Sequence, residues 1–79
     1  MKNLETISKE NTTLFNYDTN VISIGINMKC KKVITKSILY KNGKRWILKN
    51  GGINIYCDDL SNLYLDTKEN RKELRKLIK

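Results

Sequence analysis

The sequence lacks histidine, proline, alanine and glutamine, and it contains only two cysteines among its 79 residues. Without histidine, the chain has no Ser-His-Asp triad, no Cys-His pair and no histidine-ligated metal. Cys30 and Cys57 are far apart in the sequence, so they form neither a zinc-ligand cluster nor a dense disulfide framework. Two buried, reduced thiols are the favoured interpretation, and a bridge between neighbouring strands is the alternative. These absences predict a protein that is not an enzyme.

Long apolar runs are also absent. No stretch of about 18 apolar residues occurs, and residues 1–13 lack the apolar segment of a signal peptide. We therefore expect a cytoplasmic protein without a membrane partner. The length predicts one small domain spanning residues 1–79, with no room for a second core. Because so small a domain is marginally stable alone, a homodimer remains an open alternative.

Acidic residues are missing from the middle of the chain. The net charge is +8, and residues 19–57 contain no Asp or Glu but eight basic residues: Lys29, Lys31, Lys32, Lys36, Lys41, Lys44, Arg45 and Lys49. Codon bias would explain an excess of lysine, but it explains a long gap in the acids less well. A phosphate-rich partner would explain both. The alternative is a solvated sheet face whose lysines discourage edge pairing.

Residues 33–56 carry the clearest structural signal, because two β-rich stretches flank Asn42-Gly43. This dipeptide is typical of a type I′ hairpin turn. The turn would pair Leu39 with Trp46 and Tyr40 with Arg45, and a second reversal at residues 50–52 leads into another strand. One face is then predicted to be core, with Val33, Leu39, Trp46 and Leu48. The other is mixed, with Ile34, Lys36, Ile38, Tyr40, Arg45, Ile47 and Lys49.

The rest of the chain predicts further strands and one helix. Residues 12–17, 21–28 and 63–65 have strand composition or alternation, and Asp66 with Glu69 resembles a capping box that begins a helix. We predict a mainly β, α+β fold: an antiparallel five- or six-stranded meander sheet or barrel over residues 12–66, with a C-terminal helix over residues 67–79. For residues 1–11, a short helical turn and frayed or extended chain are both open.

The sequence favours a non-enzymatic, basic binding module that engages nucleic acid, or a nucleic-acid-bearing complex, through its hairpin sheet. The residues predicted to form the site are Lys36, Tyr40, Lys41, Lys44, Arg45 and Lys49. Tyrosine beside arginine is a stacking platform of the kind that single-strand binders use, although such a pair also stabilises a hairpin by itself. Tyr56 and Tyr64 alternate outward and extend this aromatic surface. No cofactor or metal is expected, since Asp58-Asp59 is ordinary turn chemistry.

Two other hypotheses remain open from the sequence. The first is a small protein–protein inhibitor or adaptor, of the kind that a phage or mobile element encodes, docking its basic face on an acidic site of a partner protein. The second is a small barrel of pleckstrin-homology-like shape, favoured only by the order of strands followed by a helix. Salt dependence and the identity of the partner would separate the nucleic-acid and inhibitor hypotheses.

Overall fold

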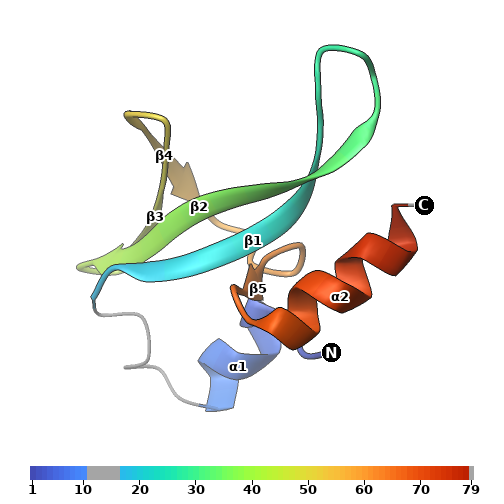
Figure 1. The fold of residues 1–79 in the computed structure, drawn as a ribbon. Helices are drawn as coiled ribbons and strands as arrows, with labels where there is room; N and C mark the ends of the chain where they lie inside the picture. Colours follow the sequence, from blue (N-terminus) through green and yellow to red (C-terminus); the bar gives the residue numbers. More distant parts are fainter. Residues whose placement is uncertain (11–16, 79) are drawn as a thin grey trace.

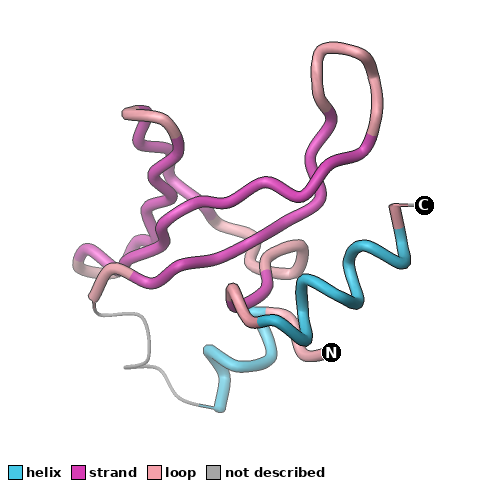
Figure 2. Tube along the Cα trace, viewed as in Figure 1, coloured by secondary structure: helices cyan, strands magenta, loops and turns pink. Residues whose placement is uncertain are grey.

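The computed structural model describes residues 1–10 and 17–78. Within them the chain forms one antiparallel five-stranded sheet and two helices (Figure 1, Figure 2). The elements are α1 (Leu4–Glu10), β1 (Thr19–Ile26), β2 (Lys32–Asn42), β3 (Arg45–Asn50), β4 (Ile53–Cys57), β5 (Tyr64–Leu65) and α2 (Lys68–Leu77). The predicted mainly β fold with a C-terminal helix is confirmed. Except for Tyr17, the strand predicted at residues 12–17 lies outside the described residues.

The strand order is β4-β3-β2-β1-β5. The first four strands form the predicted meander, and β5 then returns to the free edge of β1, where Tyr64 pairs with Ile22 and Leu65 with Val21. β4 and β5 are therefore the two edges of the sheet. Neither helix of the described chain is long and apolar enough to cross a membrane.

The central hairpin turns one residue later than predicted. Asn42 pairs with Arg45, so the two loop residues are Gly43 and Lys44. Gly43 has φ +65°, whereas Lys44 is not among the residues with positive φ. This geometry fits a turn that places glycine at its first central position, rather than the predicted type I′ turn that needs positive φ at both. The predicted pairs Leu39–Trp46 and Tyr40–Arg45 are therefore wrong.

The predicted faces are nevertheless correct. The observed partners of Leu39 and Tyr40 are Leu48 and Ile47, each two residues beyond the predicted partner. Because side chains alternate with a period of two, a displacement of two residues changes the partners but keeps each side chain on its face. The sheet thus has a core face, which carries Val21, Leu39 and Leu48, and an opposite face, which carries Ile22 and Tyr40.

The core face packs against the N-terminal helix and the segment before β5. Leu4, Val21 and Leu39 are fully buried, and together with Leu60 and Leu63 they form one apolar cluster. The backbone N–H of Leu4 also donates a hydrogen bond to the carbonyl oxygen of Leu63 (2.9 Å). Of the two alternatives open for residues 1–11, the helical one is present in α1, and its first residue is part of the core.

The opposite face of the sheet is contacted by α2 at β1 and β2, and Figure 1 shows the helix beside β1. Asp66, just before the helix, binds Arg71 through both carboxylate oxygens and lies 3.9 Å from the Lys36 amine. Lys36 pairs with Ile22 across the strands, so this cluster attaches α2 to the face of Ile22. Ile22 and Leu74 of α2 are both fully buried. We call this side of the sheet the α2 face.

The predicted N-cap of α2 is wrong by one residue. The N-cap is Thr67, whose hydroxyl accepts a hydrogen bond from the backbone N–H of Asn70 (3.1 Å). Asp66 is unavailable for capping because its carboxylate is engaged with Arg71. Among the leucines of the helix, Leu74 is buried whereas Leu77 is 61% exposed.

Truncation of the apolar cluster should destabilise the fold. Leu39→Ala removes a fully buried side chain from the central strand, so we expect the free energy of unfolding to fall by about 2–5 kcal/mol. The matched control is Ile53→Ala on the edge strand, where the side chain is 63% exposed and the loss should stay within about 0.5 kcal/mol. Urea unfolding followed by Trp46 fluorescence measures both. Equal losses in the two variants would contradict the assigned core.

The attachment of α2 should weaken in acid. Its hydrogen bonds with Arg71 lower the pKa of Asp66, so the carboxylate stabilises the fold above its ordinary pKa of about 4. That contribution disappears as the pH falls through the lowered pKa. We expect Asp66→Asn to be less stable than wild type at neutral pH, with the difference shrinking below pH about 4. Urea midpoints at several pH values test this; Asp18→Asn, at an exposed position, is the control. A pH-independent difference would contradict the role of Asp66.

Candidate nucleic-acid interface

Two tyrosines and an isoleucine form a row on the α2 face. The row runs across β2, β3 and β4, away from the Asp66 cluster. Tyr40 of β2 pairs with Ile47 of β3, which in turn pairs with Tyr56 of β4. Directly opposed residues of antiparallel strands share a face, so the three side chains lie side by side. Ile47 is only 8% exposed, whereas Tyr56 is 63% exposed. The row therefore has an apolar centre and an aromatic ring on each side.

A cation lies over each of the two rings. The Arg45 guanidinium is 4.7 Å from the centroid of the Tyr56 ring, and the Lys49 amine is 4.6 Å from that of Tyr40. Arg45 and Lys49 lie two residues on either side of Ile47, so they project from β3 on the same face. We call these five residues, Tyr40, Arg45, Ile47, Lys49 and Tyr56, the tyrosine patch.

The sequence-predicted site is thus partly assembled. Tyr40, Arg45 and Lys49 come together in the tyrosine patch, although the predicted contact of Arg45 with Tyr40 is wrong. The later turn brings Lys49 rather than Arg45 to Tyr40, and Arg45 reaches the tyrosine of the next strand instead. Sequence reasoning placed Tyr56 on an outward surface but did not include it in the site. The sequence signal that could have included Tyr56 was its alternation with Ile55 along the strand.

The other three predicted residues lie elsewhere. Lys36 is on the α2 face but is drawn toward Asp66. Lys41 is on the core face, with its amine 5.5 Å from the centroid of the Trp46 ring. Lys44 is exposed in the turn next to Arg45. The patch and this turn therefore carry three cations, Lys44, Arg45 and Lys49.

The remaining basic residues of the sheet lie at the opposite end of β2. The loop between β1 and β2 projects from the body of the protein (Figure 1) and holds Lys29 and Lys31, with Lys32 at the start of β2. The Asn27 side-chain oxygen accepts hydrogen bonds from the backbone N–H groups of Lys29 and Lys31 (2.9 and 3.0 Å). β2 has 11 residues, so the two basic regions are roughly 30 Å apart. The charge excess is divided between the two ends of β2.

A small hollow adjoins the tyrosine patch at the edge strand. It has a volume of ≈ 170 Å³ and is lined by Ile47, Asn54, Ile55 and Tyr56. Ile55 and Tyr56 point to opposite faces of β4 and both are more than half exposed, so β4 is uncovered on both sides. Ligand pockets for drug-sized molecules usually measure about 300–1,000 Å³, and this hollow is large enough only for a smaller planar group.

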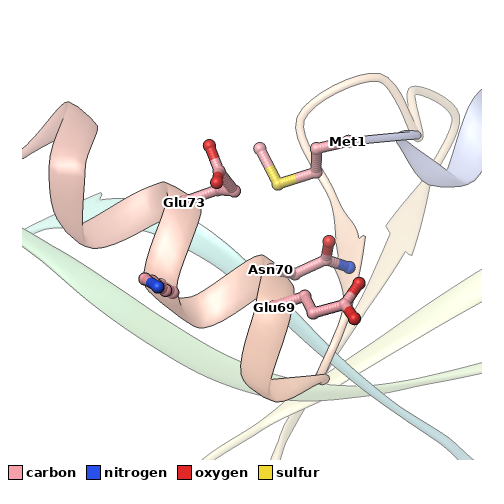
Figure 3. Close-up of a pocket in the computed structure, with 5 residues that line it drawn as sticks. Met1, Glu69, Asn70 and Glu73 are labelled. Carbon is pink, nitrogen blue, oxygen red and sulfur yellow. The ribbon is translucent and has the colours of Figure 1, made fainter.

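A second hollow, of ≈ 360 Å³, lies between the N-terminal residue and the first half of α2 (Figure 3). Glu69 and Glu73 line it together with Met1, Asn70 and Lys72. The amide of Asn70 already donates to the carbonyl oxygen of Leu65 (2.9 Å), and Glu73 pairs with Lys76 (3.6 Å). The two carboxylates make this hollow unfavourable for phosphate, so it does not extend the tyrosine patch.

Residues 1–10 and 17–78 contain no group of three Cys, Asp or Glu side chains arranged to hold a metal ion. Both cysteines are free thiols, and Cys30 is exposed rather than buried as predicted. The tyrosine patch offers cations and aromatic rings, which suit electrostatic binding and stacking. Comparisons with protein-family models, curated proteins and solved structures found no match, so the geometry alone supports a function.

The two thiols should react at different rates. Burial raises the pKa of Cys57, whose thiol also donates a hydrogen bond to the carbonyl oxygen of Asp59 (3.2 Å). The thiolate is the nucleophile, so a raised pKa and partial burial both slow alkylation. We expect iodoacetamide at pH about 8 to modify Cys30 faster than Cys57, as measured by mass spectrometry on Cys57→Ser and Cys30→Ser. Equal rates would contradict the half-buried position of Cys57.

Proposed function

We propose that the protein is a non-enzymatic binding module that engages nucleic acid through the tyrosine patch and the adjoining turn. The observation that carries this proposal is the pairing of each cation on β3 with a tyrosine ring, on three strands that contain no acidic residue. Phosphates attract the cations and release condensed counterions, and aromatic rings stack on bases. The patch presents both kinds of contact at one place.

An acidic protein surface is the competing partner, since tyrosine and arginine are also enriched at protein interfaces. Cations alone would serve an acidic surface, and Lys29, Lys31 and Lys32 supply them at the other end of β2. The tyrosine patch is different because an aromatic ring lies next to each of its cations. Docking on an acidic protein is therefore the outcome that the experiment below must be able to reveal.

Neutralising the patch should lower affinity and salt dependence together. The variant Lys44→Gln/Arg45→Gln/Lys49→Gln removes three cations that lie away from the Asp66 cluster. Each lost phosphate contact lowers the slope of log affinity against log salt by roughly 0.7 for a single strand and 0.9 for duplex DNA. Three contacts therefore predict a loss of about 2 to 3 in the slope. Fluorescence anisotropy of labelled oligonucleotides across a salt series measures both quantities.

The matched control removes the same residue types from α2. Lys68→Gln/Lys72→Gln/Arg75→Gln also replaces two lysines and one arginine, all exposed, and leaves Arg71 bound to Asp66. We expect a smaller effect on affinity and slope. Equal effects would show that only net charge matters. If the wild type binds no oligonucleotide at about 50 mM salt, where such binding is strongest, the proposal fails and an acidic protein becomes the better candidate.

A further inference from the structure

We infer that the preferred ligand is single-stranded nucleic acid, with one base stacked on Tyr56 and its edge directed into the hollow beside Asn54. This inference rests on the proposed function and names the class of nucleic acid that the same site takes. It comes from three features of the tyrosine patch: the shape of the sheet around it, the spacing of its rings and the position of the hollow.

The shape of the sheet does not suit a duplex groove. The major groove of DNA admits a helix or a two-stranded ribbon. The β2–β3 hairpin is flanked by β1 on one side and β4 on the other, so it cannot enter a groove as an isolated ribbon. The tyrosine patch instead lies on the broad surface of the sheet. Paired bases expose only their edges, whereas the faces of single-stranded bases can stack on a ring.

The spacing of the rings also favours unpaired bases. Tyr40 and Tyr56 lie on strands separated by β3, which places their backbones roughly 9–10 Å apart. Neighbouring bases in a duplex are separated by only about 3.4 Å. Two rings at this spacing cannot both receive adjacent bases of a regular helix. A flexible single strand can separate its bases and place one on each ring.

The cations over the rings do not prevent stacking. An exposed cation–π contact changes an equilibrium constant by roughly 2- to 5-fold. Stacking of a base on an aromatic side chain is worth about 5- to 150-fold. A base can therefore displace Arg45 from Tyr56, and the released guanidinium is then free to contact a phosphate. Before binding, the contact keeps the cation close to where the phosphate will lie.

The hollow gives the edge of the base a polar partner. The hollow is lined by Ile47, Asn54, Ile55 and Tyr56, of which Asn54 carries the one amide side chain. The Asn54 side chain makes no hydrogen bond to another described residue, so its donor and acceptor groups are available to a ligand. A volume of ≈ 170 Å³ beside the exposed ring matches a single planar group rather than a whole nucleotide.

The test compares three labelled probes of about ten nucleotides: a single-stranded RNA, the DNA of the same sequence, and the duplex of that DNA. We expect both single strands to bind more tightly than the duplex at about 50 mM salt. Tyr56→Leu keeps apolar bulk but removes the ring, so it should weaken the single strands by roughly 5- to 150-fold and the duplex much less. The relative affinity of RNA and DNA shows whether the ribose hydroxyl is also contacted.

The matched control is Tyr17→Leu, the same change at a tyrosine that is 83% exposed outside the patch, and it should leave all three affinities unchanged. Asn54→Ala should reduce differences in affinity among homopolymeric single strands. In NMR spectra, ring protons of Tyr56 should move upfield on addition of the single strand. If duplex binds as tightly as single strand and Tyr56→Leu behaves like Tyr17→Leu, the inference is overturned and the proposed function stands. If no probe binds, the proposed function itself fails.

Discussion

Burial of both sides of β1 is the constraint on which the rest of the structure depends. Val21 and Ile22 are neighbours and point to opposite faces, yet both are fully buried. Two separate layers must therefore cover the strand. On the side of Val21 these are α1 and the segment before β5, and on the side of Ile22 it is α2. The described chain supplies one such layer for each face.

The limited reach of α2 leaves the tyrosine patch uncovered. The helix has ten residues, about 15 Å, and it is attached at Asp66 beside the first two strands of the meander. Its main contacts with the sheet are to β1 and β2. Within the described residues, neither helix makes a comparable contact with β3 or β4. Ile47 is consequently shielded by the rings and cations around it rather than by a helix, and the functional proposal follows from this arrangement.

The fold could be predicted largely because its signals are local. Alternation of apolar residues marked the strands, and a glycine between two β-rich stretches marked the reversal. The position of the turn was wrong, since Gly43 satisfies either of two turn types and only its φ angle with that of Lys44 distinguishes them. The predicted faces were still correct because the strand partners were displaced by two residues, which keeps each side chain on its face. The cap of α2 was displaced for a related reason: Asp66 and Thr67 can both cap, and Arg71 decides between them.

The site was less predictable because it depends on contacts between distant residues. The sequence shows that residues 19–57 are basic, but not that Lys29, Lys31 and Lys32 lie roughly 30 Å from the turn. It gives no sign that Lys36 is drawn toward Asp66. Arg45 and Tyr56 meet only because β4 pairs with β3 in a particular register. Each of these positions depends on how the strands pair and pack, which local composition does not reveal.

The cation–ring pairs also have a purely structural explanation, which accounts for only part of the pattern. Such pairs stabilise neighbouring strands by about 0.5–1 kcal/mol each, so they explain why Arg45 and Lys49 lie over tyrosines. A surface ion pair with Asp or Glu would contribute a similar amount, about 0–1 kcal/mol. Stability alone would therefore accept acids on β2, β3 and β4, yet these strands have none. An anionic ligand does require their absence, because a carboxylate in the patch would repel phosphate and occupy the cations that should meet it.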